Sequence, residues 1–160
     1  MTDRALRRKL TFRAHGATLV LIKRPAESAE HVLQKALVWA LYLPAYPDLR
    51  VEVPLPGPER YKPDLLSLDG ERPRFWGECG VVSVAKLNDL LRRYRATHFL
   101  FSKWNMPVDP FAALIERALK GLRRSAPVEL ICFPADAARH VAEDGEIRIT
   151  QRDVERRRWE

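Results

Sequence analysis

The chain has 160 residues, which is enough for one domain with a substantial hydrophobic core. Apolar residues make up 46% of the sequence and charged residues 31%, a balance that is typical of a globular protein and excludes a disordered chain. Lysine and arginine outnumber aspartate and glutamate by 28 to 21, so the net charge of +7 favours solubility and is compatible with a polyanionic partner.

No segment has the properties of a membrane span or a secretion signal. The longest apolar run, residues 36–45, contains Pro44 and is about half as long as the roughly twenty residues that a span needs. The basic N-terminal segment has no long apolar stretch behind it. These features predict a cytoplasmic protein without a membrane anchor. The scarcity of Asn and Gln, together with 12 prolines, is typical of a thermophile.

The two cysteines, Cys79 and Cys132, lie in apolar, strand-like runs. Neither has a second cysteine or a histidine at the spacing of a zinc site. A free cysteine packs as a small hydrophobic residue, so we expect two buried thiols.

The order of the predicted elements follows from hydrophobic periodicity and from turn residues. Apolar residues recur at helical spacing between residues 28 and 43, and Pro44 ends that helix. An Asp69-Gly70 pair separates two apolar runs and predicts a hairpin. The full prediction is one or two strands in 10–22, helix 28–43, strand 49–55, loop 56–63, strand 64–69, strand 74–82, a helix from Ser83 to 96, strand 98–104, helix 110–124, strand 128–134, a short helix in 136–145, a last strand or edge segment in 146–154, and a charged, loose tail at 155–160.

This order predicts a single α/β domain, residues 1–160, with a mixed central sheet that is flanked by helices. Side chains alternate faces along a strand, so Trp76, Glu78 and Gly80 should share one face. The Asp69-Gly70 hairpin then brings Asp64 close to Glu78.

Two carboxylates held close together repel each other, and a divalent cation relieves that repulsion. Carboxylates, backbone carbonyls and waters are the ligands of Mg²⁺ or Mn²⁺. Lys86 lies eight residues after Glu78, in the first turn of the next helix, and its ammonium can reach the same place. A metal ion and a lysine together can activate water and stabilise the charge of a phosphoryl transition state.

These residues resemble the PD-(D/E)XK nuclease superfamily. The lysine of that pattern usually stands two positions after the acid, where this chain has Gly80, so Lys86 is the candidate for a lysine displaced to the following helix. More narrowly, the chain is similar to the YaeQ family of that superfamily over about residues 10–135. The resemblance is carried by PAESAEHVLQKALVWALYL at 25–43, KPDLL at 62–66, FWGECG at 75–80, and Lys86-Leu87.

The resemblance implies a restriction-endonuclease-like αβββαβ core with a metal site at one edge of the sheet. Carried over by position, Glu30 is the outer acidic residue on the first helix and Asp64 is the central metal ligand. Glu78 is the second ligand, together with the carbonyl of Cys79, and Lys86 is the displaced lysine. The implied cofactor is Mg²⁺ or Mn²⁺.

The two carboxylates of this set also have structural interpretations. Asp64 follows Pro63, and aspartate often caps a turn at such a place. Glu78 has Arg74 and Arg92 as potential partners in an ion pair without any catalytic role.

The other two residues have rivals. An acid near a helix N-terminus is explained by the helix dipole, and Glu27 competes with Glu30 for the role at the site. Lys86 is an ordinary solvated lysine in the alternative interpretation, and Lys62 is its rival.

Three functions are compatible with these features. The first is a metal-dependent nuclease that hydrolyses phosphodiesters of DNA or RNA. The second is a nuclease-like fold that no longer cuts and binds nucleic acid or a protein, an interpretation supported by Gly80 at the lysine position. The third is an endonuclease subunit that needs a specificity partner.

Nucleic acid is the expected partner, and a homodimer is one option for the oligomeric state. Arginine clusters at 92–95, 123–124 and 156–158 are candidate contacts to phosphates, although such runs are more often solvated faces.

Overall fold

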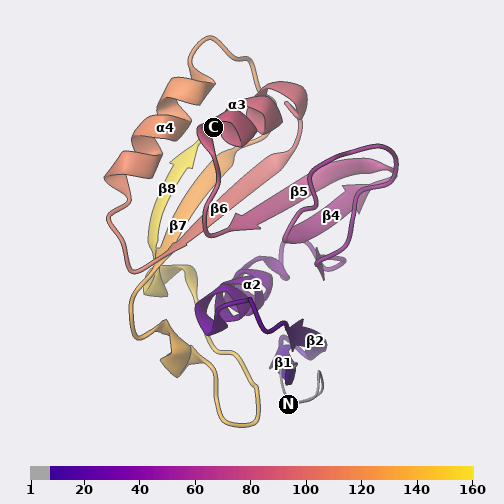
Figure 1. Cartoon of the computed structure of the whole chain (residues 1–160), viewed down its shortest axis with the longest axis vertical. Helices are drawn as coiled ribbons and strands as arrows, with labels where there is room; N and C mark the ends of the chain where they lie inside the picture. The colour runs from indigo at the N-terminus through magenta and orange to yellow at the C-terminus, as the bar shows by residue number, and fades with distance from the viewer. Residues whose placement is uncertain (1–7) are drawn as a thin grey trace.

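The computed structural model of the chain describes residues 8–160 (Figure 1). None of the helices within this range combines the length and the apolar character that a membrane crossing requires. The elements are β1 (Arg8–Ala14), β2 (Ala17–Lys23), α2 (Ala29–Tyr42), β3 (Arg50–Val51), β4 (Leu65–Asp69), β5 (Arg72–Cys79), α3 (Val84–Arg93), β6 (His98–Trp104), α4 (Asp109–Leu119), β7 (Val128–Phe133), the 3₁₀ turns η1 (Ala137–His140) and η2 (Gln151–Asp153), and β8 (Glu155–Trp159).

The principal sheet has six strands in the order β3-β4-β5-β6-β7-β8. The central pairs β5–β6 and β6–β7 are parallel, and the outer pairs are antiparallel. The sheet is therefore mixed, as predicted, and its parallel strands are connected through α3 and α4. Strands β1 and β2 form a separate two-stranded sheet.

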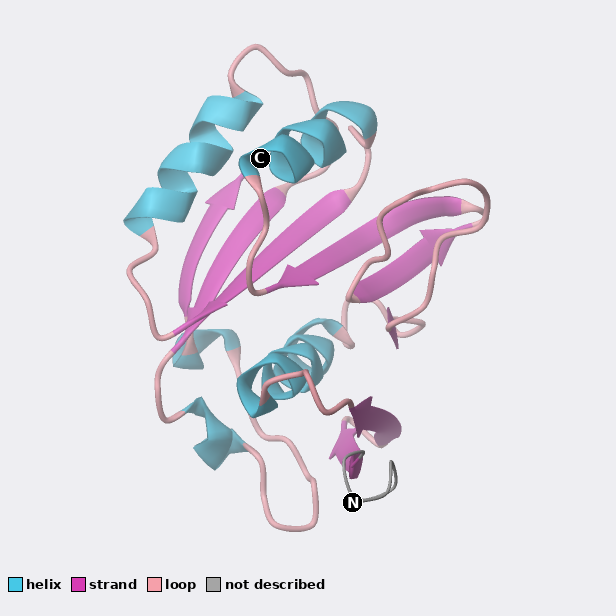
Figure 2. Ribbon diagram, viewed as in Figure 1, coloured by secondary structure: helices cyan, strands magenta, loops and turns pink. Residues whose placement is uncertain are grey.

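Helices cover both faces of the large sheet (Figure 2). On one face, α2 packs against β5 and β6, whose core residues there include Phe75 and Leu100, and the β1–β2 hairpin joins the same core through α2. On the other face, α3 and α4 pack against Trp76, Phe99 and Phe101. Alternate residues of β5 therefore enter different cores, which confirms the predicted alternation of faces along that strand.

Short polar signals set the local boundaries. The Ser28 and Ser83 side chains accept hydrogen bonds from the amides of His31 and Lys86, each at 3.1 Å, so both helices begin with a serine cap. The β1–β2 turn places His15 and Gly16 at positive φ, as in a two-residue hairpin turn of type I′.

Several predicted elements are shorter in the structure. The strand expected at 49–55 is reduced to β3, because Glu52 adopts a φ of 59° and prolines follow it. The helix expected to reach residue 124 ends at Leu119, near Gly121 with a φ of 79°. The return strand begins two residues earlier than predicted and ends at Cys79. The expected helix in 136–145 is only the η1 turn, and the strand expected in 146–154 is an irregular segment that includes η2.

The prediction of a loose tail at residues 155–160 is corrected by strand β8, which pairs antiparallel with β7. Glu129 on β7 is 1% exposed and lies 3.0 Å from both Arg156 Nε and Arg158 Nη1. It also accepts a hydrogen bond from the hydroxyl of Tyr42 at 2.5 Å and lies 3.0 Å from His98 Nε2. A buried carboxylate thus anchors a segment whose arginines looked solvated in the sequence.

This anchor predicts a pH-dependent stability. Burial by itself raises the pKa of Glu129, but contacts with His98, Arg156 and Tyr42 outweigh it and lower the pKa to about 2. The unfolded carboxyl titrates near 4.5, so the stabilisation is complete above that pH and is lost as the pH falls through the folded-state pKa. We expect the free energy of unfolding, measured by urea denaturation, to decline between about pH 4.5 and pH 2. The free energy of unfolding of the Glu129→Gln variant should decline less over the same pH window. If the two proteins gave parallel profiles of unfolding free energy against pH, this role of Glu129 would be contradicted.

Candidate functional site

Asp64 and Glu78 face each other where β4 and β5 meet. The amide of Asp64 donates to the carbonyl of Gly77 at 3.0 Å, and Leu65 is the ladder partner of Gly77. This register places Asp64 opposite Glu78, as the hairpin predicted. Asp64 Oδ2 accepts a hydrogen bond from the Cys79 amide at 2.8 Å, so the carboxylate is fixed against the end of β5.

Glu78 is a buried carboxyl that is only 4% exposed. Trp76 Nε1 donates to Glu78 Oε1 at 2.9 Å, from the neighbouring position on the same face of β5. Burial raises the pKa of Glu78, and the nearby charge of Asp64 acts in the same direction, while Trp76 and Lys86 oppose them. The site therefore favours the approach of a positive charge.

Lys86 supplies such a charge within the chain. Ser83 caps helix α3 and sets the orientation of its first turn, from which Lys86 Nζ reaches Glu78 Oε1 at 3.1 Å. The structure thus brings Lys86 to Glu78, and the alternative partners Arg74 and Arg92 pair with Asp48 and Asp89 instead. Lys62, the rival lysine, is exposed.

Glu30 is not part of this group. It is exposed in the first turn of α2, and no contact within the described residues joins it to Asp64 or Glu78. The competing residue, Glu27, is linked to the site through His31. Glu27 Oε2 lies 2.7 Å from His31 Nδ1, and His31 Nε2 lies 3.8 Å from Asp64 Oδ2.

His31, Lys35 and Glu52 are residues near the site that the sequence did not identify. Lys35 is 1% exposed, and its ammonium forms ion pairs with both Glu27 and Glu52. Burial lowers the pKa of Lys35, but the two carboxylates outweigh that effect and raise it. The spacing of four places His31 and Lys35 on one side of α2, and this was the available signal. Glu27 precedes the Ser28 cap and contacts both side chains from there.

A cavity of about 350 Å³ lies beside these residues. It is lined by Arg24, Ala26, Glu27, His31, Glu52 and Lys62. His31 lines this cavity and also lies 3.8 Å from Asp64, so one side chain separates the cavity from that carboxylate.

A second lysine, Lys103 of β6, comes close to the end of β5. Its ammonium donates to the carbonyl of Gly80 at 2.5 Å and lies 3.9 Å from the centre of the Phe111 ring. Burial lowers the pKa of Lys103 to about 8. Gly80 has a φ of 88°, a conformation that strains any side-chain-bearing residue. The backbone therefore gives a physical reason for the missing lysine at that position.

The donor groups at the site suit a hard cation that keeps part of its water shell. Among residues 8–160, no group of three or more His, Cys, Asp or Glu side chains is arranged to hold a metal ion. Magnesium in proteins is often bound through only one or two carboxylates, with water completing its coordination. Asp64 and Glu78 meet this requirement. Cys79 is buried, and burial raises the pKa of its thiol, so its backbone carbonyl is its only suitable ligand.

Two solved structures share this fold. The YaeQ protein from Pseudomonas syringae is 17% identical with a TM-score of 0.58, and the match covers 94% of this chain and 91% of that protein. The YaeQ protein from Xanthomonas axonopodis pv. citri is 17% identical with a TM-score of 0.56, covering 84% of this chain and 76% of that protein. No family model and no curated protein sequence matches the chain. The likeness shows a YaeQ-like fold, and fold alone does not assign an activity.

Proposed function

We propose that the protein is a metal-dependent nuclease that hydrolyses phosphodiester bonds in nucleic acid. The observation that carries this proposal is the grouping of Asp64, Glu78 and Lys86, with the lysine ammonium 3.1 Å from the Glu78 carboxylate. The element order α2-β3-β4-β5-α3-β6 supports it, because it follows the αβββαβ order of the restriction-endonuclease-like core.

Asp64, Glu78 and the carbonyl of Cys79 are the proposed ligands of Mg²⁺ or Mn²⁺. The Cys79 amide already points to Asp64, which keeps this carboxylate next to the end of β5. A divalent cation held there supplies Lewis-acid activation and neutralises charge at the phosphate.

In the proposed reaction, Lys86 is the protonated side chain that acts at the phosphate or the attacking water. Its Nζ donates hydrogen bonds to a phosphate oxygen or orients the attacking water, and it stabilises negative charge as that charge develops. Serine capping and the contact with Glu78 hold this ammonium at the carboxylate pair before substrate arrives.

The cavity beside His31 is the proposed path of the nucleic acid. Arg24 and Lys62 are exposed on its wall and can meet phosphate groups. Of the arginine clusters, Arg93 pairs with Glu59 and Asp89, and Arg156 and Arg158 pair with Glu129, so these side chains already have carboxylate partners.

A nuclease-like fold that no longer cuts is the second candidate. The observation that favours it is the direct ion pair of Lys86 with Glu78, because the lysine then neutralises the charge of that carboxylate without a metal ion. Such a protein would bind nucleic acid or a protein partner.

Titration calorimetry with Mn²⁺ separates the two candidates. We expect saturable binding by the wild-type protein and none by the Asp64→Ala/Glu78→Ala double variant, because both proposed side-chain ligands are then removed. Bound Mn²⁺ should also raise the melting temperature of the wild type alone, by mass action. Absence of binding in the wild type, with and without an oligonucleotide, would contradict the nuclease proposal and favour the second candidate.

A further inference from the structure

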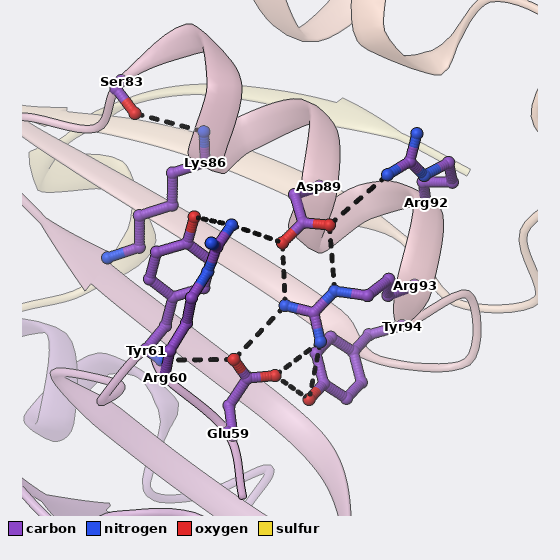
Figure 3. A network of polar contacts seen from close by, with 9 residues as sticks. All are labelled: Glu59, Arg60, Tyr61, Ser83, Lys86, Asp89, Arg92, Arg93 and Tyr94. Carbon is purple, nitrogen blue, oxygen red and sulfur yellow. Dashed lines mark hydrogen bonds and ion pairs between the residues drawn. The ribbon is translucent and has the colours of Figure 1, made fainter.

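Lys86 makes a second contact besides its ion pair with Glu78. Its ammonium lies 5.0 Å from the centre of the Tyr61 ring, and the Arg60 guanidinium also lies against this ring at 4.6 Å. Figure 3 shows the Lys86 side chain extending from α3 alongside Tyr61. An ammonium at this range from an aromatic ring is attracted by the negative charge of the ring face.

The loop that carries Tyr61 is tied to the same helix that carries Lys86. Glu59, whose side chain is 6% exposed, lies 2.6 Å from Arg93 Nη1 and also accepts a hydrogen bond from the Tyr94 hydroxyl. Arg93 in turn pairs with Asp89 at 2.9 Å (Figure 3). Burial raises the pKa of Glu59, but Arg93 and Tyr94 outweigh that effect and lower it to about 2. The carboxylate therefore stays ionised and keeps the loop on α3 at neutral pH.

The same carboxylate also fixes the position of Tyr61. The Tyr61 amide donates to Glu59 Oε2 at 3.1 Å, so the backbone of the ring-bearing residue is held by the group that anchors the loop. Asp64 follows three residues after Tyr61 and directly precedes β4. The same segment of chain thus carries the Tyr61 ring beside Lys86 and, three residues later, Asp64 at the end of β5.

We propose that Tyr61 is a positioning residue that holds the Lys86 ammonium at the Glu78 carboxylate. A lysine side chain samples many rotamers, and two simultaneous contacts reduce that number. An exposed cation–π contact corresponds to about a two- to fivefold preference for the bound rotamer. The catalytic consequence of this positioning rests on the proposed nuclease function, whereas the placement of Lys86 does not.

The placement can be measured by NMR without any activity. Protons above an aromatic ring resonate upfield of their ordinary position, and the chain has only seven lysines, so a sample labelled at lysine Cε gives a simple spectrum. The Lys86 signal is assigned by its disappearance in Lys86→Arg. We expect an upfield shift in the wild type, its loss in Tyr61→Leu and its retention in Tyr61→Phe, which keeps the ring. An ordinary Lys86 shift in the wild type, or an unchanged shift in Tyr61→Leu, would overturn the proposal.

The catalytic consequence has its own measurement. In a cleavage assay, Tyr61→Leu should lower kcat about two- to fivefold and leave KM and Mn²⁺ affinity unchanged, and Tyr61→Phe should restore kcat. In a Lys86→Met background, Tyr61→Leu should have no further effect, because the positioned group is gone. An unchanged kcat in Tyr61→Leu, or a loss that persists in the Lys86→Met background, overturns the positioning role. If the wild type does not cleave, the nuclease proposal fails, and the NMR result still shows whether Tyr61 holds the Lys86 ammonium at Glu78.

Discussion

The Asp64→Asn variant is expected to lose Mn²⁺ binding and at least about 100-fold of the cleavage rate. Asparagine keeps the shape of the side chain, and its amide oxygen can still accept the hydrogen bond that the Cys79 amide donates at 2.8 Å. The substitution therefore removes the charge and leaves the packing. The measurements are Mn²⁺ titration calorimetry and the cleavage rate of a labelled oligonucleotide.

The matched control is Asp69→Asn. Asp69 is exposed at the far end of β4, where it is the backbone ladder partner of Arg72 across the hairpin turn. This variant should bind Mn²⁺ and cleave like the wild type. Both variants should melt close to the wild-type temperature, so that a loss in Asp64→Asn reports on the site. Wild-type cleavage by Asp64→Asn would remove Asp64 from the proposed mechanism.

The Glu129→Ala variant is expected to lose about 3–5 kcal/mol of stability, because removing one member of a buried ion-pair network leaves the others uncompensated. Glu129 is 1% exposed and is contacted by His98, Arg156, Arg158 and the Tyr42 hydroxyl. For a chain of this size, such a loss corresponds to a fall of roughly 10 °C in the melting temperature. Urea denaturation and thermal unfolding both measure it.

Arg157→Ala is the control on the same strand. Arg157 lies between the two arginines that contact Glu129, but its side chain is 44% exposed and pairs with the exposed Asp109. An exposed pair of this kind contributes at most about 1 kcal/mol. If Glu129→Ala and Arg157→Ala lowered the free energy of unfolding by equally small amounts, strand β8 would not depend on the buried carboxylate.

Local signals in the sequence account for much of the fold. The helices predicted to begin near residue 28 and at Ser83 correspond to α2 and α3, and in the structure both Ser28 and Ser83 are N-caps, which form within one turn. The run from His98 to Trp104 predicted β6 with its observed bounds. The lengths of β3 and α4 were harder to predict, because positive φ values at Glu52 and Gly121 end these segments.

The candidate site also combines features that local sequence predicted with one that it did not. The opposed positions of Asp64 and Glu78 could be predicted from a hairpin turn and from the two-residue period of a strand, which are both local properties. The reach of Lys86 to Glu78 followed from the short connection between β5 and α3. Glu30 was carried over from a resemblance, and the structure leaves it exposed while His31 approaches Asp64.

The order and spacing of elements along the chain predicted the α/β class, the mixed sheet and the closeness of Asp64 and Glu78, with Lys86 as the candidate lysine and Lys62 as its rival. Long-range packing alone brings Tyr61 beside Lys86, Lys103 to the carbonyl of Gly80, and Glu129 to the arginines of β8. These contacts join segments that lie more than twenty residues apart. Their partners are set by strand order and by the packing of helices on the sheet, and no local period in the sequence encodes that order.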